Sequence, residues 1–305
     1  MGAMKMATGS IRSPESAAAA RNPNSPARTA VRRYLRNPLA VLGAAVFACI
    51  LILTIGAPLF THYSPYAANI LNTDAPPSPR HILGTDGLGY DNFTRLLYGG
   101  RTDLLVAFAA ALCVMAIGTV YGGISGYCGG WIDSILMRFV DVMLNFPTIL
   151  LIIVLQSIMN TQSPWLLIGV VSVTSWPGAA RFMRGVFLQL REMDYVVGAQ
   201  TIGCSRARII FRHMLPNTAG VLAVLVGFGV SGYIGLIAAL QLIGFGLPIT
   251  DPSWGVMLAP ALNYISLTQE PWTWIPPAAM IVSSILCINF ISDGLRDALD
   301  PTAFR

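Results

Sequence analysis

The sequence lacks the residues that most catalytic and nucleotide-binding sites need. A phosphate-binding P-loop requires a lysine after its second glycine, and the only lysine in the chain is Lys5. A Gly-x-Gly-x-x-Gly string occurs at residues 227–232, but it lies inside an apolar stretch, where small residues serve close helix packing. The histidines and cysteines are scattered, with no CxxC pair and no Ser-His-Asp arrangement. We therefore expect no ATP hydrolysis, no bound metal or cofactor and no covalent catalysis by this chain.

The composition is typical of a polytopic helical membrane protein. Of 305 residues, 54% are hydrophobic and only 11% are charged, whereas about a quarter of the residues in a soluble domain are charged. Several apolar stretches approach the roughly 20 residues that cross a bilayer as a helix, and they do not alternate as β-barrel strands do. The composition excludes an ordinary globular enzyme, a disordered protein and a fibrous protein, and it predicts an all-α membrane fold.

The apolar stretches predict six transmembrane helices, so that both termini lie on one side of the membrane. The expected spans are residues 39–60, 102–126, 134–159, 165–187, 218–246 and 273–294. The chain then divides into a basic tail at residues 1–37, disordered over residues 1–30, a first helix and polar segment at 38–101, and a core at 102–305. The core contains a loop at about residues 191–217.

The distribution of basic residues predicts the orientation in the membrane. Sixteen of the nineteen lie in the first tail, in or just before the 191–217 loop, near the turn between the second and third spans, or after the last span. The other three are Arg80, Arg95 and Arg101. The positive-inside rule therefore places both termini and the 191–217 loop in the cytoplasm, and residues 61–101 and 247–272 outside.

The 191–217 loop alternates small, apolar and basic residues at helical spacing. Gly203 can break a helix there, and Pro216 fixes the entry to the next span. A cytoplasmic amphipathic helix needs something to cover its apolar face. The pattern leaves two interpretations open: a helix that lies on the membrane surface, or an element on which a cytoplasmic partner docks.

This loop resembles the EAA loop of binding-protein-dependent ABC importer permeases. Gly203 is followed after nine residues by His213, Met214, Leu215 and Pro216, as in that family. Where the family usually has Glu-Ala-Ala, this chain has Val197, Gly198 and Ala199, so the acidic residue is absent. The glycine and Leu-Pro frame of the loop is retained.

Other segments resemble the C-type permease of oligopeptide and dipeptide importers, in the expected order from about residue 31 to 302. They comprise residues 81–91 with 95–101, residues 137–147, residues 244–255 and residues 293–301. Tyr90 stands where an arginine is usual, and Ala238 stands where an acidic residue is common. The resemblance implies a six-span permease of the type I ABC importer fold in the bacterial cell membrane.

The resemblance also implies partners and a coupling site. The partners are a second permease subunit, two cytoplasmic ABC ATPase subunits that dock under the loop, an external substrate-binding protein and a peptide substrate, with membrane lipid around the spans and no nucleic acid. ATP binding would close the ATPase pair and move the docked helices. The residues we expect to couple that motion to the spans are Gly198, Ala199, Gly203, Arg206, Arg208 and Pro216.

Polar residues within the spans are candidates for the transport path or for structural pairing. We interpret four charged residues as structural groups near the cytoplasmic ends of the spans: Arg138, Asp141, Asp293 and Arg296. At those positions ion pairing or snorkelling toward water lowers the free-energy cost of a charge. Candidates for a polar path are Asn145, Gln156, Gln241 and Asn289. The external tryptophans, Trp254, Trp272 and Trp274, are expected to be interfacial anchors.

Three alternatives stay open at this point. A nickel, glutathione or opine permease of the same group shares these motifs, although no histidine cluster favours a metal. An ion-driven secondary transporter would need a buried acidic residue at mid-membrane, and none is evident at the centre of an expected span. A membrane enzyme or sensor would need a reactive constellation, which the sequence does not contain.

Overall fold

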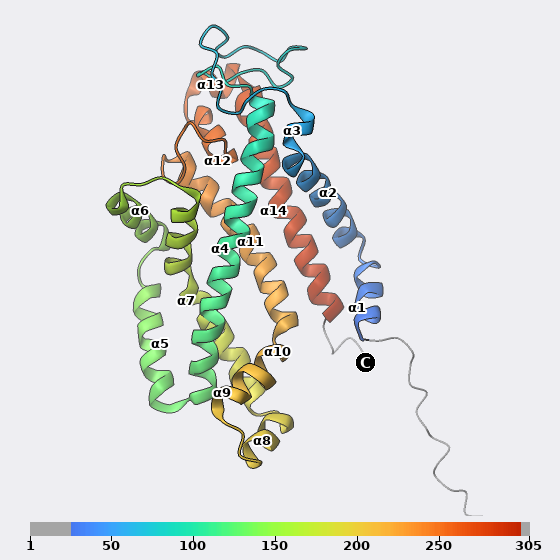
Figure 1. The fold of residues 1–305 in the computed structure, drawn as a ribbon, viewed down its shortest axis with the longest axis vertical. Helices are drawn as coiled ribbons and strands as arrows, with labels where there is room; N and C mark the ends of the chain where they lie inside the picture. Colours follow the sequence, from blue (N-terminus) through green and yellow to red (C-terminus); the bar gives the residue numbers. More distant parts are fainter. Residues whose placement is uncertain (1–25, 300–305) are drawn as a thin grey trace, which may run out of the picture.

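The protein is an elongated bundle, and its long helices run along most of the length of the molecule (Figure 1). The computed structural model describes residues 26–299. Within this range the only β-type pairing is one isolated bridge between Thr85 and Asp91. Five helices are long and apolar enough to cross a membrane, or six if one bent pair is counted as a single span. The predicted all-α membrane fold is confirmed.

The long helices are α2 (Pro38–Ile55), α4 (Asn92–Cys128), α7 (Pro164–Arg191), α11 (Ala219–Leu242) and α14 (Pro271–Leu299), and the bent pair is α5 (Gly130–Leu144) with α6 (Thr148–Met159). The short elements are α1 (Pro26–Tyr34), α3 (Ala57–Phe60), α8 (Asp194–Thr201), α9 (Arg206–Arg208), η2 (Ile209–Met214), α10 (Leu215–Asn217), α12 (Trp254–Met257), η3 (Ala259–Leu262) and α13 (Tyr264–Gln269). Segments α8–α10 lie at one end of the bundle, and α3, α13 and the long 61–91 segment lie at the other (Figure 1). We call these the α8 end and the α13 end.

The third expected span, residues 134–159, is not one straight helix. Helices α5 and α6 meet at an 80° bend. The break contains Phe146 and Pro147, and Pro147 has an extended ψ of 118° as the residue before α6. Proline has no N–H to continue the helix, and it disfavours helical geometry in the residue before it. The expected span is therefore present as a bent pair of helices rather than as one straight helix.

Two other boundaries differ from the sequence expectations. Helix α4 begins ten residues before the expected second span, because the Asp91 side chain caps it by accepting the Thr94 N–H at 2.8 Å. Its 37 residues extend about 55 Å, well beyond the hydrocarbon core of a bilayer. The expected disordered tail overlaps helix α1 over residues 26–30, and residues 1–25 lie outside the described part of the chain.

Helices α4 and α7 pack against each other along a seam of small residues. Gly118, Gly122 and Gly126 recur every four residues on α4. A side chain at Gly122 would place its Cβ 2.2 Å from the Ala180 carbonyl oxygen, and one at Gly126 would lie 2.6 Å from the Arg184 oxygen. Backbones that approach this closely make many van der Waals contacts. Such contacts hold membrane helices together, because the hydrophobic effect does not drive helices to associate within lipid.

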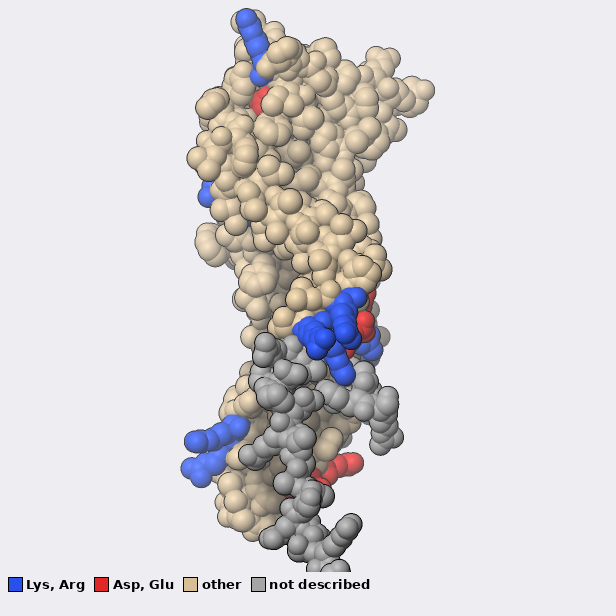
Figure 2. All heavy atoms as spheres, turned by 90° about the vertical axis from the view of Figure 1, so that its right-hand side faces the viewer, with Lys and Arg blue, Asp and Glu red and all other residues tan. Residues whose placement is uncertain are grey.

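The string at residues 227–232 serves packing at two of its three glycines, and a Cβ at Gly229 would lie 3.5 Å from the Ala111 Cβ on α4. A Cβ at Gly227 would lie 2.1 Å from the Ser292 Oγ on α14, whereas a Cβ at Gly232 would meet no atom within 4 Å. The face formed by α1, α2 and α14 is mostly uncharged over a broad band, with basic side chains gathered below it (Figure 2). This distribution fits helices that are bounded by lipid along their middle.

Candidate functional site

The predicted coupling residues lie in a compact helical turn at the α8 end of the molecule (Figure 1). Helix α8 carries Gly198 and Ala199, the turn after it contains Gly203, and α9 carries Arg206 and Arg208. Pro216 lies in α10, directly before α11. The structure thus brings all six predicted residues into one segment, residues 194–217, which we call the coupling segment.

Gly203 ends α8 through a Schellman motif. Its φ of +80° is left-handed, where a side chain is disfavoured. The Cys204 N–H donates to the Ala199 carbonyl at 3.1 Å, and the Gly203 N–H donates to the Gln200 carbonyl at 3.0 Å. These are the two hydrogen bonds of the motif, and half-buried Cys204 joins the apolar cluster that contains Ala199. Gly203 therefore sets the angle between α8 and α9.

Pro216 shapes the second half of the coupling segment. Residues Ile209–Met214 form a π-helix, in which the Leu215 N–H bonds to the Ile210 carbonyl five residues earlier. Because the proline ring at 216 would crowd the carbonyl four residues before it, a wider turn relieves that contact. The Asn217 amide donates to the His213 carbonyl at 2.9 Å, which satisfies an acceptor in the same turn.

One face of the coupling segment is anchored to the ends of α4 and α7. Val196, Ile209 and Met214 are each no more than 1% exposed. With Ala199 and Ile210 they form a cluster with residues of α4 and α7, namely Met115, Tyr127, Met183 and Phe187. The coupling segment is therefore packed directly against two long helices.

The other face of the coupling segment is exposed and carries large apolar side chains among polar and basic ones. Gly198, Arg206, Arg208 and Pro216 are exposed, while Ala199 is buried in the anchored face. The large apolar side chains on the open face are Tyr195, Val197, Ile202 and Phe211, with Ile202 80% exposed. Exposed apolar side chains of this size, when they gather on one surface, mark a contact with a protein or a membrane.

Charged pairs join α5 to α7. The Arg184 guanidinium donates from Nε and Nη2 to the two Asp133 carboxylate oxygens at 2.5 Å each, and the Ser125 hydroxyl donates to the same carboxylate. Arg181 pairs with Asp141 at 2.5 Å. The expected structural pairing thus holds for Asp141, and its partner is Arg181 on α7.

A buried polar cluster ties short helix α12 to α4 near the other end. The Asp103 carboxylate accepts the Trp254 N–H at 2.7 Å, the Ser253 hydroxyl at 3.0 Å and the Gln241 amide at 3.2 Å. Trp254 is fully buried, and its indole N–H donates to the Leu96 carbonyl at 2.8 Å. The expectation that Trp254 is an interfacial anchor was therefore wrong.

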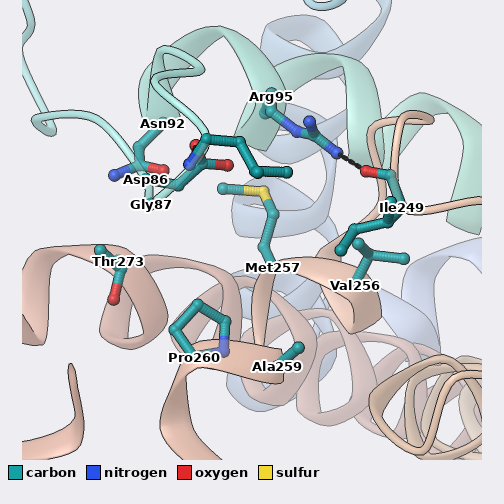
Figure 3. A pocket seen from close by; sticks show the side chains of 11 residues that line it. Asp86, Gly87, Asn92, Arg95, Ile249, Val256, Met257, Ala259, Pro260 and Thr273 are labelled. Carbon is teal, nitrogen blue, oxygen red and sulfur yellow. Dashed lines mark hydrogen bonds between the residues drawn. The ribbon is translucent and has the colours of Figure 1, made fainter. Parts of the chain in front are cut away.

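Arg95 holds the start of α4 against the loop after α11. Its Nη2 donates to the Ile249 and Asp251 carbonyls at 2.7 and 3.1 Å, and its guanidinium lies 4.3 Å from the Tyr90 ring centroid. The side chain borders a pocket of about 370 Å³ with Asp86, Met257 and Pro260 (Figure 3). Burial raises the pKa of Asp86, although hydrogen bonds from backbone N–H groups and the charge of Arg95 act in the opposite direction.

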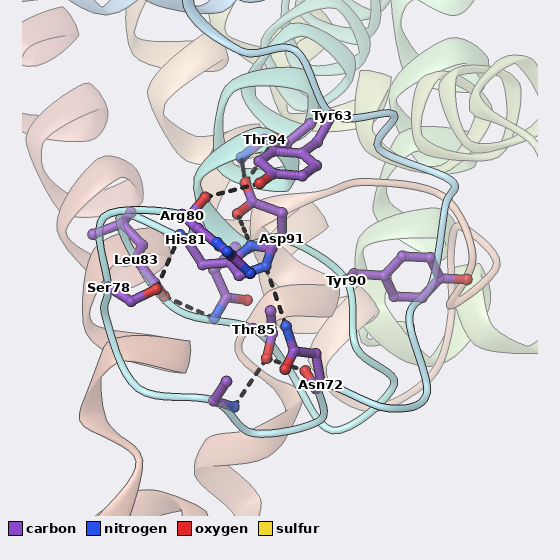
Figure 4. Close-up of polar contacts among 12 residues, drawn as sticks. Tyr63, Asn72, Ser78, Arg80, His81, Leu83, Thr85, Tyr90, Asp91 and Thr94 are labelled. Carbon is purple, nitrogen blue, oxygen red and sulfur yellow. Dashed lines mark hydrogen bonds and ion pairs between the residues drawn. The ribbon is translucent and has the colours of Figure 1, made fainter.

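The 61–91 segment folds around His81 (Figure 4). The imidazole Nδ1 lies 2.8 Å from an Asp91 carboxylate oxygen, and the Tyr63 ring stacks on it with centroids 5.1 Å apart. Thr85 accepts the Ala75 N–H and donates to the Asn72 carbonyl. This network orders a segment that otherwise has little regular structure, so that the cap of α4 is held in place.

The four residues expected to line a polar path have different hydrogen-bond surroundings. Gln241 belongs to the Asp103 cluster, and Asn289 accepts a hydrogen bond from Ser231. Asn145 bonds to the Asp141 carbonyl within α5, whereas Gln156 borders a pocket. Over the described residues there is no group of three or more His, Cys, Asp or Glu that could hold a metal ion.

Two family models match this sequence. Residues 118–305 match the "Binding-protein-dependent transport system inner membrane component" model, and residues 25–77 match the "N-terminal TM domain of oligopeptide transport permease C" model.

Curated relatives cover nearly the whole chain. The oligopeptide transport system permease protein OppC of Bacillus subtilis is 37% identical over 274 residues, 90% of this chain and 89% of that protein. The dipeptide transport system permease protein DppC of Alkalihalophilus pseudofirmus is 38% identical over 279 residues, 91% of this chain and 90% of that protein.

A solved structure shares the fold. A chain of the inward-facing MetNI methionine ABC transporter aligns with a TM-score of 0.56 at 16% identity, and it covers 68% of this chain and 97% of its own length.

Proposed function

Because the chain belongs to the family of inner membrane components of binding-protein-dependent transport systems and is a permease subunit of an ABC importer, we propose that it carries peptides. In this proposal it forms half of the pathway, and a second permease forms the other half. An external binding protein delivers the peptide, and two ATPase subunits bind the coupling segment from the cytoplasm. The observation that carries the proposal is the coupling segment, which is anchored on one face and exposes large apolar and basic side chains on the other.

The two faces of the coupling segment favour protein docking over a position on the membrane surface. The segment lies at an end of the bundle, where the long helices stop (Figure 1). Its open apolar side chains are flanked by Arg206 and Arg208, which suit an acidic rim on a partner. Val197 replaces the acidic residue usual in such loops, so apolar packing carries more of this contact.

The peptide substrate is proposed from the relatives, whose names specify oligopeptide and dipeptide transport. A peptide carries the same backbone whatever its sequence, so a weakly polar path is sufficient and selection falls mainly to the external binding protein. In the described residues the long helices present few charges toward one another, apart from the α5–α7 pairs and the Asp103 cluster.

ATP must act by favouring one conformation over another. A ligand shifts a two-state equilibrium only by its difference in affinity for the two states. ATP binding would close the ATPase pair and favour the outward-open permease. The cluster that joins the coupling segment to α4 and α7 would carry this motion into the spans.

Reconstitution into vesicles tests the proposal directly. The complete assembly, with both permeases, both ATPases and the binding protein, should accumulate radiolabelled peptides only when ATP is supplied on the ATPase side. Chain copurification should recover the ATPases, and recovery should fall when Val197, Ile202 and Phe211 are changed together to serine. Uptake by this chain alone, or ATP-independent uptake driven by an ion gradient, would exclude the proposal. Preferential uptake of nickel or glutathione would retain the importer and change its substrate.

A further inference from the structure

A second pocket lies between the end of α6 and the connection that follows α11. Its volume is about 420 Å³, which is within the size range of small-molecule sites. It is bordered by Gln156, Ser157, Asn160, Gln162, Gly244 and Phe245. No charged residue lines it. Both α6 and this connection lie in the half of the molecule away from α8 (Figure 1).

Gln156 is the buried polar side chain of this pocket. It is one turn after fully buried Ile152 on α6, and only 8% of its own surface is exposed. No hydrogen bond joins its side-chain amide to another residue in the described range, and the residue lines the pocket. Its amide oxygen and nitrogen are therefore free to bond to a molecule in the pocket.

Two helix ends give this pocket the character of a hydrogen-bond acceptor. Helix α6 ends at left-handed Asn160, whose φ is 45°, and α11 ends in a Schellman motif at Gly244, whose φ is +87°. In the latter motif the Phe245 N–H bonds to the Leu240 carbonyl at 2.8 Å and the Gly244 N–H to the Gln241 carbonyl at 3.0 Å. The carboxyl ends of helices carry partial negative charge, so the pocket favours a donor.

We propose that this pocket binds a backbone N–H group of the transported peptide, with the Gln156 side-chain oxygen as the acceptor. The inference rests on the proposed peptide transport function. A neutral amide recognises a peptide unit whatever side chains flank it, because the glutamine side chain offers one acceptor oxygen and two N–H donors. The uncharged lining leaves charged and apolar peptides equally acceptable, so Gln156 is a positioning contact for the backbone itself.

The test compares peptides with ester analogues in the assembled transporter. Vesicles receive radiolabelled di-, tri- and tetra-alanine, each beside the analogue in which the first amide N–H is replaced by an ester oxygen. The ratio of peptide to ester uptake is measured for the wild type and for Gln156→Met, which keeps the side-chain length and removes the amide. The binding protein discriminates between peptide and ester to the same extent with the wild type and with the variant, so its contribution cancels when the two uptake ratios are compared.

We expect the wild-type ratio to exceed the Gln156→Met ratio by about three- to tenfold, the worth of one neutral hydrogen bond. The ratio of peptide to ester uptake does not depend on how much of the protein folds. If Gln156→Met is poorly expressed, Gln156→Leu provides a second measurement of the same ratio. The matched control is Gln269→Leu, which removes an exposed glutamine of α13 outside the pocket and should keep the wild-type ratio. Equal ratios in the wild type and Gln156→Met overturn this inference alone. A wild type that moves none of these peptides overturns the proposed function, and the inference with it.

Discussion

At the scale of single residues, Gly203 is the sharpest test of coupling. An aspartate in its left-handed conformation would cost about 1–2 kcal/mol, enough to shift a two-state turn about tenfold. No atom lies within 4 Å of the position of its Cβ, so the substitution acts on the turn without a steric clash. We expect Gly203→Asp to leave the protein inserted, to lower peptide uptake about tenfold, and to leave ATP hydrolysis running without transport.

Gly130 offers a matched control for Gly203. It also has a positive φ, of +55°, and open space at its Cβ, but it begins α5, outside the coupling segment. Gly130→Asp should impose similar strain and keep the ratio of ATP hydrolysed to peptide transported. Uptake by Gly203→Asp at the wild-type rate would show that the turn after α8 does not transmit the ATPase motion.

The raised pKa of Asp86 predicts that the stability of the protein depends on pH. Burial is the largest influence on its carboxyl group and raises the pKa in the folded protein. The folded state then binds the proton more tightly than the unfolded state, so the ionised carboxylate is a cost at neutral pH that is relieved as the pH falls through the raised pKa. Asp86→Asn keeps the acceptor oxygen that caps the Leu88 and Tyr90 N–H groups.

Thermal unfolding in detergent at several pH values measures this effect. Asp86→Asn should unfold at a higher temperature than the wild type at pH 7, and the difference should shrink as the pH is lowered toward 4. An unfolding temperature below that of the wild type at pH 7 would mean that the charge of Asp86 stabilises the fold, contrary to the direction of its pKa shift.

At the scale of elements, the α4–α7 seam connects packing to coupling. A valine at position 122 would meet the Ala180 carbonyl oxygen and the Arg184 nitrogen, both backbone atoms that cannot turn aside. Overpacking of this kind costs about 1–3 kcal/mol or more. We expect Gly122→Val to lower the unfolding temperature of the purified protein. Gly185→Val on α7, where no atom lies within 4 Å of the Cβ, carries the same helix penalty and should change it far less.

Hydropathy alone located the long helices, because their apolar composition is a local property. Helices α7, α11 and α14 lie within a few residues of the expected spans. The bend between α5 and α6 was missed, although Pro147 marks it, since an average over a window does not register one backbone break. The glycine repeat of α4 was also visible in the sequence, at residues 118, 122 and 126.

The roles of Arg95 and Asp103 could not be predicted from local sequence. Both lie among polar residues at the expected boundary of a span, which is typical of an exposed segment. Their partners are about 150 residues away, in the connection between α11 and α12 and at the start of α12. The coupling segment was easier to locate, because its glycine and proline act on the backbone within a few residues. The outward exposure of Ile202 and Phe211 depends on how the segment packs on α4 and α7.

At the scale of the whole molecule, the orientation in the membrane remains the prediction on which ATP coupling depends. The coupling segment and the 61–91 segment lie at opposite ends of the bundle, so one cysteine in each reports the orientation (Figure 1). Leu71 is 91% exposed and Ile202 is 80% exposed, and both are therefore open to a reagent. In a background where all five cysteines are alanine, Leu71→Cys should react with an impermeant maleimide on intact cells. Ile202→Cys should react only after permeabilisation, and less when the ATPases are bound. The opposite pattern would place the coupling segment on the side without ATP, and no ATPase could then drive this permease.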